Sequence, residues 1–84
     1  MNKKHRKTLE AIFEEPVRAN IAWQDIEVLF EALGAEVWQG RGSRIRVALH
    51  DVRAVFHRPH PRPEANRPLV RSVRRFLQEA GVAL

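Results

Sequence analysis

An arginine and a histidine that we expect to face each other across two strands are the side chains here best suited to chemistry. Arg44 and His57 lie on opposite strands of a predicted hairpin, where directly opposed Cβ atoms are about 4.5–5.5 Å apart. Two facing cations repel, so folding gives no reason for this pair, and the arginine favours the neutral imidazole. A guanidinium can bind a phosphate through two hydrogen bonds while a neutral imidazole accepts a 2′-hydroxyl proton. The pair therefore suits attack on an RNA phosphodiester, although an exposed polar strand edge would also account for it.

The register of this hairpin follows from its apolar pattern. Strands are expected at 44–49 and 52–57, joined by a two-residue loop of His50 and Asp51. With this loop, apolar residues oppose each other on one face, in the pairs Ile45–Phe56, Val47–Ala54 and Leu49–Val52. A slip of one residue would destroy this agreement. The other face carries Arg44, Arg46, Arg53 and His57. On that face Arg46 would help Arg44 to hold the phosphate.

Helical periodicity predicts three amphipathic helices around this hairpin. They span about residues 3–15, 22–33 and 67–80, with Asn66 as the N-cap of the last one. A further strand is expected at 36–39, so the order is helix, helix, three antiparallel strands, helix. This order is typical of an α+β domain of two layers, with the helices on one face of the sheet and the other face open.

The sequence carries a net charge of +5, and the excess is uneven. Residues 1–40 hold 5 basic and 7 acidic residues, whereas residues 41–84 hold 10 basic and 3 acidic residues. An arginine-rich half of a small chain suggests a polyanion or an acidic protein as partner, against the simpler interpretation of a well-solvated surface. No stretch resembles a membrane span or a signal peptide, so we expect a cytoplasmic protein. The lack of cysteine excludes disulfides and thiolate zinc sites.

Further side chains extend the candidate site. His60 lies in a proline-rich loop and is a second candidate catalytic residue. His57 and His60 could supply half of a metal site, but without a third ligand we expect neither a metal nor another cofactor. If Trp38 rather than Val37 points away from the core, its ring could stack on a base or anchor a partner, although packing is the more common role of such a residue. An arginine row on the last helix could follow a phosphate backbone or face an acidic partner. The candidate RNA-binding residues are Gly42, Ser43, Arg46, Arg53, Arg58, Arg67, Arg71 and Arg74.

Four ordered segments carry a family resemblance, namely IAWQDIEVLFEALGAE (Ile21–Glu36), GRGSRIRV (Gly40–Val47), FHRPHP (Phe56–Pro61) and RSVRRFLQEAGV (Arg71–Val82). With these segments the chain resembles the HicA family of bacterial toxins over about residues 20–82. The resemblance implies a fold like that of a double-stranded-RNA-binding domain and a metal-independent ribonuclease that cleaves messenger RNA. It also implies a HicB-type antitoxin as partner, which covers the active face. We therefore expect an N-terminal extension helix at 1–19 and a HicA-like domain at 20–84.

One position departs from the family pattern. The resemblance implies a Gly-Ser-His motif whose histidine is catalytic, whereas this sequence has Gly42, Ser43 and Arg44. Arginine stays protonated and cannot act as a general base. Either cleavage has been lost, or another histidine has taken over, or the residue was changed to make a toxic protein tolerable to express. For the second case the hairpin register nominates His57, with His60, near the histidine of the family's proline-rich segment, as the other candidate.

Three functions remain open on the sequence alone. The leading one is a toxin that cleaves messenger RNA. The second is a non-catalytic RNA-binding module of the same fold, in which Arg44 marks lost chemistry. The third is a basic interaction protein for an acidic partner.

Overall fold

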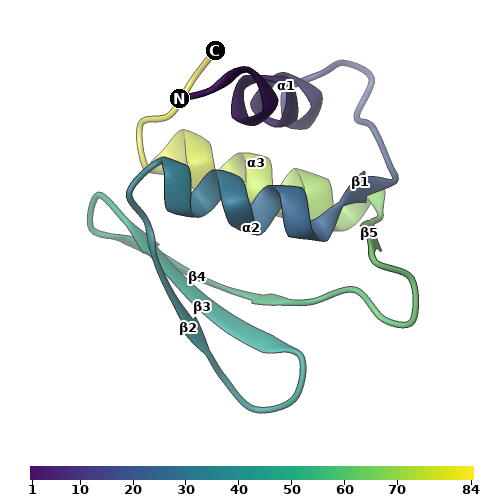
Figure 1. Cartoon of the computed structure of the whole chain (residues 1–84), viewed down its shortest axis with the longest axis vertical. Helices are drawn as coiled ribbons and strands as arrows, with labels where there is room; N and C mark the ends of the chain where they lie inside the picture. Colours follow the sequence, from purple (N-terminus) through teal and green to yellow (C-terminus); the bar gives the residue numbers. More distant parts are fainter.

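The chain forms three helices, a three-stranded sheet and a two-stranded ribbon, as a computed structural model of residues 1–84 shows (Figure 1). In chain order the elements are α1 (Lys3–Ile12), β1 (Ile21–Ala22), α2 (Trp23–Ala32), β2 (Glu36–Gln39), β3 (Arg44–Leu49), β4 (Val52–His57), β5 (Glu64–Ala65) and α3 (Arg67–Glu79). The predicted α+β class and the order of helices and main strands are confirmed. The β1–β5 ribbon was not predicted, because strands of two residues are too short to show an alternating pattern. None of the helices is long and apolar enough to cross a membrane.

Helices α2 and α3 lie against one face of the β2–β3–β4 sheet and leave its other face open (Figure 1). Phe30 of α2 and Phe76 of α3 both pack on Phe56 of β4, with ring centroids 5.8 Å apart in each case. Helix α1 lies on the far side of α2 and α3 from the sheet, so the chain has three layers rather than the predicted two. The open face therefore belongs to the strands alone.

The register of the β3–β4 hairpin is the predicted one, with Arg44 opposite His57 and Ile45 opposite Phe56. His50 and Asp51 form its turn with φ of 49° and 67°. Two positive φ values give the turn the twist that matches two antiparallel strands. His50 also bonds through Nδ1 to the carbonyl oxygen of Ala80, at 2.7 Å, which ties the turn to the C-terminal end of α3.

The helix ends follow local chemistry closely. Asn66 caps α3 as predicted, since its Oδ1 accepts a hydrogen bond from the backbone N–H of Leu69 at 3.0 Å. Helix α1 ends at Ile12, earlier than the predicted residue 15. A proline disfavours helical backbone at the residue before it, so Pro16 opposes a helix that extends to residue 15.

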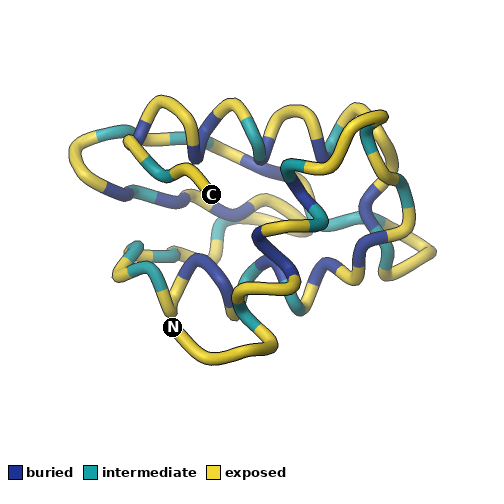
Figure 2. Tube along the Cα trace, turned by 90° about the horizontal axis from the view of Figure 1, so that it is seen from above, coloured by how far each residue is buried: buried dark blue, intermediate teal, exposed yellow.

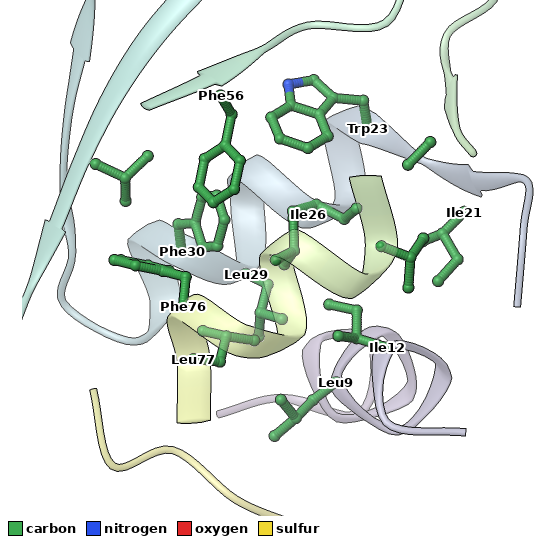
Figure 3. Packing of buried hydrophobic residues seen from close by; sticks show 14 of the residues in the cluster. Leu9, Ile12, Ile21, Trp23, Ile26, Leu29, Phe30, Phe56, Phe76 and Leu77 are labelled. Atoms are coloured by element: carbon green, nitrogen blue, oxygen red, sulfur yellow. The ribbon is translucent and has the colours of Figure 1, made fainter. Parts of the chain in front are cut away.

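One apolar cluster joins all three layers. Buried positions recur along each helix while the remaining positions face outward (Figure 2). Trp23, Phe30, Phe56 and Phe76 form an aromatic group between the sheet and the helices, with neighbouring ring centroids 5.7–6.4 Å apart (Figure 3). Trp23 is buried in this group. Leu9 and Ile12 of α1 belong to the same cluster, so the first helix shares the core of the residues that follow it (Figure 3).

Candidate nucleic-acid interface

The open face of the sheet brings together several of the predicted site residues. Strand alternation turns Ile45 and Val47 to the core, so Arg44 and Arg46 lie on the open side, and His57 is exposed opposite Arg44. Residues two apart on one strand are about 7 Å apart and share a face. The Arg44–His57 pair and Arg46 thus occupy adjacent rows of one surface.

The arginines of this face have no acidic partner. Arg44, Arg46 and Arg53 are exposed and take part in none of the ion pairs of the protein, which join other residues. The one carboxylate on the face is Glu36, which lies opposite Ala48 at the far end of β2. The face therefore carries uncompensated positive charge, which suits it to an anionic ligand.

The orientation of Trp38 is settled by the packing of β2. Val37 lies opposite Val47 and packs against the core, whereas Trp38 is opposite Arg46 and 45% exposed. On the next strand Val55 is opposite Arg46 and 52% exposed. A shallow hollow of about 410 Å³ lies over this part of the face, lined by Trp38, Arg46, Val47, Arg53, Ala54 and Val55.

Arg58 lies on the other side of the sheet from His57. Its Nε and Nη2 donate to the carboxylate of Glu27 on α2 at 2.8 and 3.0 Å, and its Nη1 donates to the side-chain oxygen of Gln39. The hydrogen bond that Arg58 donates to Glu27 raises the pKa of Arg58 above its usual value, and the negative charge of the same carboxylate adds to this, while burial acts in the opposite direction. The guanidinium predicted to bind RNA is thus occupied within the protein.

The turn before Arg44 is held by the same group of residues. Gln39 Nε2 donates to the carbonyl oxygen of Gly42 at 3.1 Å, and the backbone N–H of Arg58 donates to that of Ser43 at 2.8 Å. A Cβ at Gly40 would lie 2.9 Å from the carbonyl oxygen of Arg44, so this close turn requires glycine. The turn that precedes Arg44 is therefore bonded directly to the residue that follows His57.

Sequence reasoning missed Glu27 and Gln39 as members of this network. The alternation of the strands offered a signal, because Gln39 lies opposite the core residue Ile45 and Arg58 follows the outward-facing His57. Both side chains must then lie on the helix side of the sheet. The partner on α2 could not be identified, since the position of that helix along the sheet is a tertiary property.

The arginine row of α3 faces the N-terminal segment rather than the open sheet face. Arg74 donates to the carbonyl oxygens of Ile12 and Glu14 at 2.8 and 2.7 Å and pairs with the carboxylate of Glu15. Arg67 donates to the carbonyl oxygen of Val17 at 3.2 Å. Arg71 lies between them in the row and is exposed. Two of the three predicted RNA-binding arginines therefore have intramolecular partners, and we do not retain Arg67 and Arg74 in the candidate site.

His60 is exposed in the loop between β4 and β5. Its side chain makes neither a hydrogen bond nor an ion pair with another residue. Histidine and acidic side chains nowhere form a group of three that could hold a metal ion. His5 of α1 is half-buried, and its Nδ1 has no hydrogen-bond partner.

Comparison with protein families gives one match. The family model described as HicA toxin of bacterial toxin-antitoxin matches residues 23–82, which includes α2, the sheet and α3. Comparison with curated proteins and with solved structures gives no significant match.

Proposed function

Because the chain belongs to the HicA family, the toxins of bacterial toxin–antitoxin systems, we propose that it is a metal-independent endoribonuclease that cleaves messenger RNA. The proposal is carried by the exposed Arg44–His57 pair on a face whose arginines have no acidic partners. A HicB-like antitoxin would neutralise the toxin by covering this face. With messenger RNA as its substrate, the protein acts in the cytoplasm.

The proposed reaction assigns one task to each side chain. His57 accepts the proton of a ribose 2′-hydroxyl, whose oxygen attacks the adjacent phosphorus. The bond from phosphorus to the 5′-oxygen breaks, which leaves a 2′,3′-cyclic phosphate, and His60 protonates the departing 5′-oxygen. Arg44 and Arg46 bind the non-bridging phosphate oxygens and stabilise the charge that develops on them.

Cleavage of RNA by matched variants tests the proposal. We expect wild-type protein to cut RNA in the presence of a chelator. His57→Ala should cut at least about 100-fold more slowly, since general bases contribute about 10²–10⁴-fold. Arg75→Ala, which removes an exposed arginine from α3 away from the sheet face, serves as the control and should cut at the wild-type rate. Equal cleavage by wild type and His57→Ala would remove His57 from the mechanism.

The arginine in the family's histidine position favours a second function, a non-catalytic RNA-binding module. The variant Arg44→His restores the family motif after Gly42 and Ser43 and separates the two functions. If the wild type binds RNA without cutting it and Arg44→His cuts, the natural chain is the binding module. If the wild type already cuts, Arg44 is a phosphate ligand and Arg44→Ala should lower cleavage while His57 remains essential.

A further inference from the structure

We propose that the open sheet face is a platform for single-stranded RNA, on which Trp38 stacks on one base while Arg46 and Arg53 bind the neighbouring phosphates. The inference rests on the proposed function in taking RNA as the ligand. It adds the form of RNA that binds and the residue that selects that form.

The ring of Trp38 is positioned for stacking by the register of β2. Because Val37 packs against the core opposite Val47, Trp38 must point away from it, and the ring remains 45% exposed. It lies opposite Arg46, whose own cross-strand neighbour Val55 is also exposed. The three side chains give one continuous row across the sheet with an aromatic ring at one end. Aromatic rings on such surfaces stack on bases with little sequence preference, because every base has a π-face.

The row lies next to the candidate catalytic pair. Arg46 is two residues from Arg44 on β3, and Val55 is two residues from His57 on β4, so the two rows are about 7 Å apart on the same face. A base stacked on Trp38 therefore places an adjoining phosphodiester beside Arg44 and His57. The hollow of about 410 Å³ over the row is in the size range of small-ligand sites and leaves room for a nucleotide.

The chemistry of the face favours a single strand of RNA over a duplex. A duplex keeps its bases stacked inside and is bound through phosphates, 2′-hydroxyls and shape, which an exposed indole does not serve. A stable protein interface buries about 800 Å² on each partner around an apolar centre, and this face exposes only Trp38 and Val55 as large apolar residues, so an antitoxin that covers it needs further contacts beyond it. The face combines one aromatic ring with three arginines that lack acidic partners.

Binding of an uncleavable oligonucleotide tests the proposal apart from catalysis. The probe is a single-stranded 2′-O-methyl RNA of about eight nucleotides, a length within the range of single-strand sites. Trp23 is buried among phenylalanines, so quenching of tryptophan fluorescence by the probe reports on Trp38 in the wild type, while the fluorescence anisotropy of a dye-labelled probe gives the affinity of every variant. We expect Trp38→Ala and Trp38→Leu to weaken binding about 5- to 100-fold and Trp38→Phe to retain most of the affinity. Equal affinity of Trp38→Leu and wild type would overturn the proposal, and the leucine keeps the test valid if the alanine variant folds poorly.

Salt dependence separates stacking from phosphate contacts. We expect Trp38→Leu to leave the slope of log affinity against log salt unchanged. Arg46→Ala should reduce the magnitude of this slope by about the contribution of one phosphate contact. Arg75→Ala on α3 is the matched control and should change neither affinity nor slope. Trp38→Leu must also leave the affinity for a duplex of the same charge unchanged, and an equal loss on both forms would contradict selection of single strands.

The two proposals fail in distinguishable ways. If the wild type binds the uncleavable probe through Trp38 but cuts no RNA, the platform stands and the ribonuclease does not. If the wild type cuts RNA while Trp38→Leu binds and cuts as the wild type does, the ribonuclease stands and the platform does not. If the oligonucleotide does not bind at all and only the antitoxin binds to this face, the proposal of an RNA platform is wrong.

Discussion

At the scale of single residues, the candidate site has one side chain suited to binding phosphate and another suited to proton transfer. In the proposed reaction an arginine can bind the phosphate but cannot accept a proton, so the proton is assigned to His57 on the neighbouring strand. Nothing in the core requires either side chain, because both lie on the face that the helices leave open. Substitutions there should alter RNA binding or cleavage while leaving the free energy of unfolding nearly unchanged.

Arg58 is predicted to act by position rather than by contact with RNA. Its guanidinium is bound to Glu27 and Gln39 on the helix side of the sheet, and its backbone N–H holds the turn before Arg44. We expect Arg58→Ala to lower the rate of RNA cleavage. We also expect it to lower the free energy of unfolding by about 1 kcal/mol, a small value because the ion pair is partly exposed. It should leave the salt dependence of RNA binding unchanged, because no phosphate contact is lost.

The variant Glu27→Gln serves as the companion test. It breaks the same ion pair without removing a positive charge and should reproduce the loss in cleavage rate. Fluorescence titrations at several salt concentrations and single-turnover cleavage provide the two measurements. A lower salt slope for Arg58→Ala would instead make Arg58 a phosphate ligand, as the sequence alone had indicated.

At the scale of elements, α1 is attached to the rest of the chain through its C-terminal end. The last carbonyl groups of a helix lack intrahelical partners. Arg74 of α3 supplies donors to Ile12 and Glu14, and its guanidinium lies 5.8 Å from the centre of the Phe13 ring. A cation also interacts favourably with the negative end of the helix dipole.

Arg74→Ala is therefore expected to loosen α1. Hydrogen bonds to charged groups contribute about 1.5–3 kcal/mol, and the Arg74 side chain is only 14% exposed. We expect a loss of about 2 kcal/mol in the free energy of unfolding, measured by urea denaturation. The neighbouring Arg75→Ala should change it by less than about 0.5 kcal/mol. Equal stability of the two variants would show that the contacts of Arg74 contribute nothing net.

Particular elements show how far the sequence alone could lead. The bounds of β2, β3 and β4 and the hairpin register were predicted correctly, because strand alternation and a two-residue turn are local patterns. The third layer, the β1–β5 ribbon and the partners of Arg58 and Arg74 were not, because each depends on residues distant in sequence. Within the candidate site the sequence placed Arg44, Arg46, Arg53 and His57 on one face but left Trp38 undecided. An exposed arginine and one bonded to a distant helix look alike in sequence.

At the scale of the whole molecule, the residues before the family match are part of the core. The match begins at residue 23, yet Leu9 and Ile12 are buried in the same cluster as Leu29 and Leu77. We propose that the extension at 1–19 covers an apolar surface that the domain at 20–84 would otherwise expose. Its role is then structural, since it lies on the opposite side of the helices from the candidate site (Figure 1).

Ile12→Ala tests this role. Ile12 is fully buried, and truncation of buried isoleucine typically costs about 2–5 kcal/mol. We expect a loss of about 3 kcal/mol in a single cooperative transition followed by tryptophan fluorescence, with the partly exposed Val28→Ala as the control. If α1 docks independently of the core, the main transition will stay at the wild-type denaturant concentration and the proposal will be wrong.

The hairpin turn of His50 and Asp51 has a consequence for how this protein can change over time. Along β3 and β4 every second codon specifies a residue on the core side and the codons between specify the open face. Point mutations can therefore redesign what the toxin binds without touching what keeps it folded. An insertion or deletion of one codon within either strand would exchange the two faces, bury the arginines and expose the aliphatic residues. The alternation along these two strands is therefore sensitive to a change in length, whereas the residues of either face can be substituted separately.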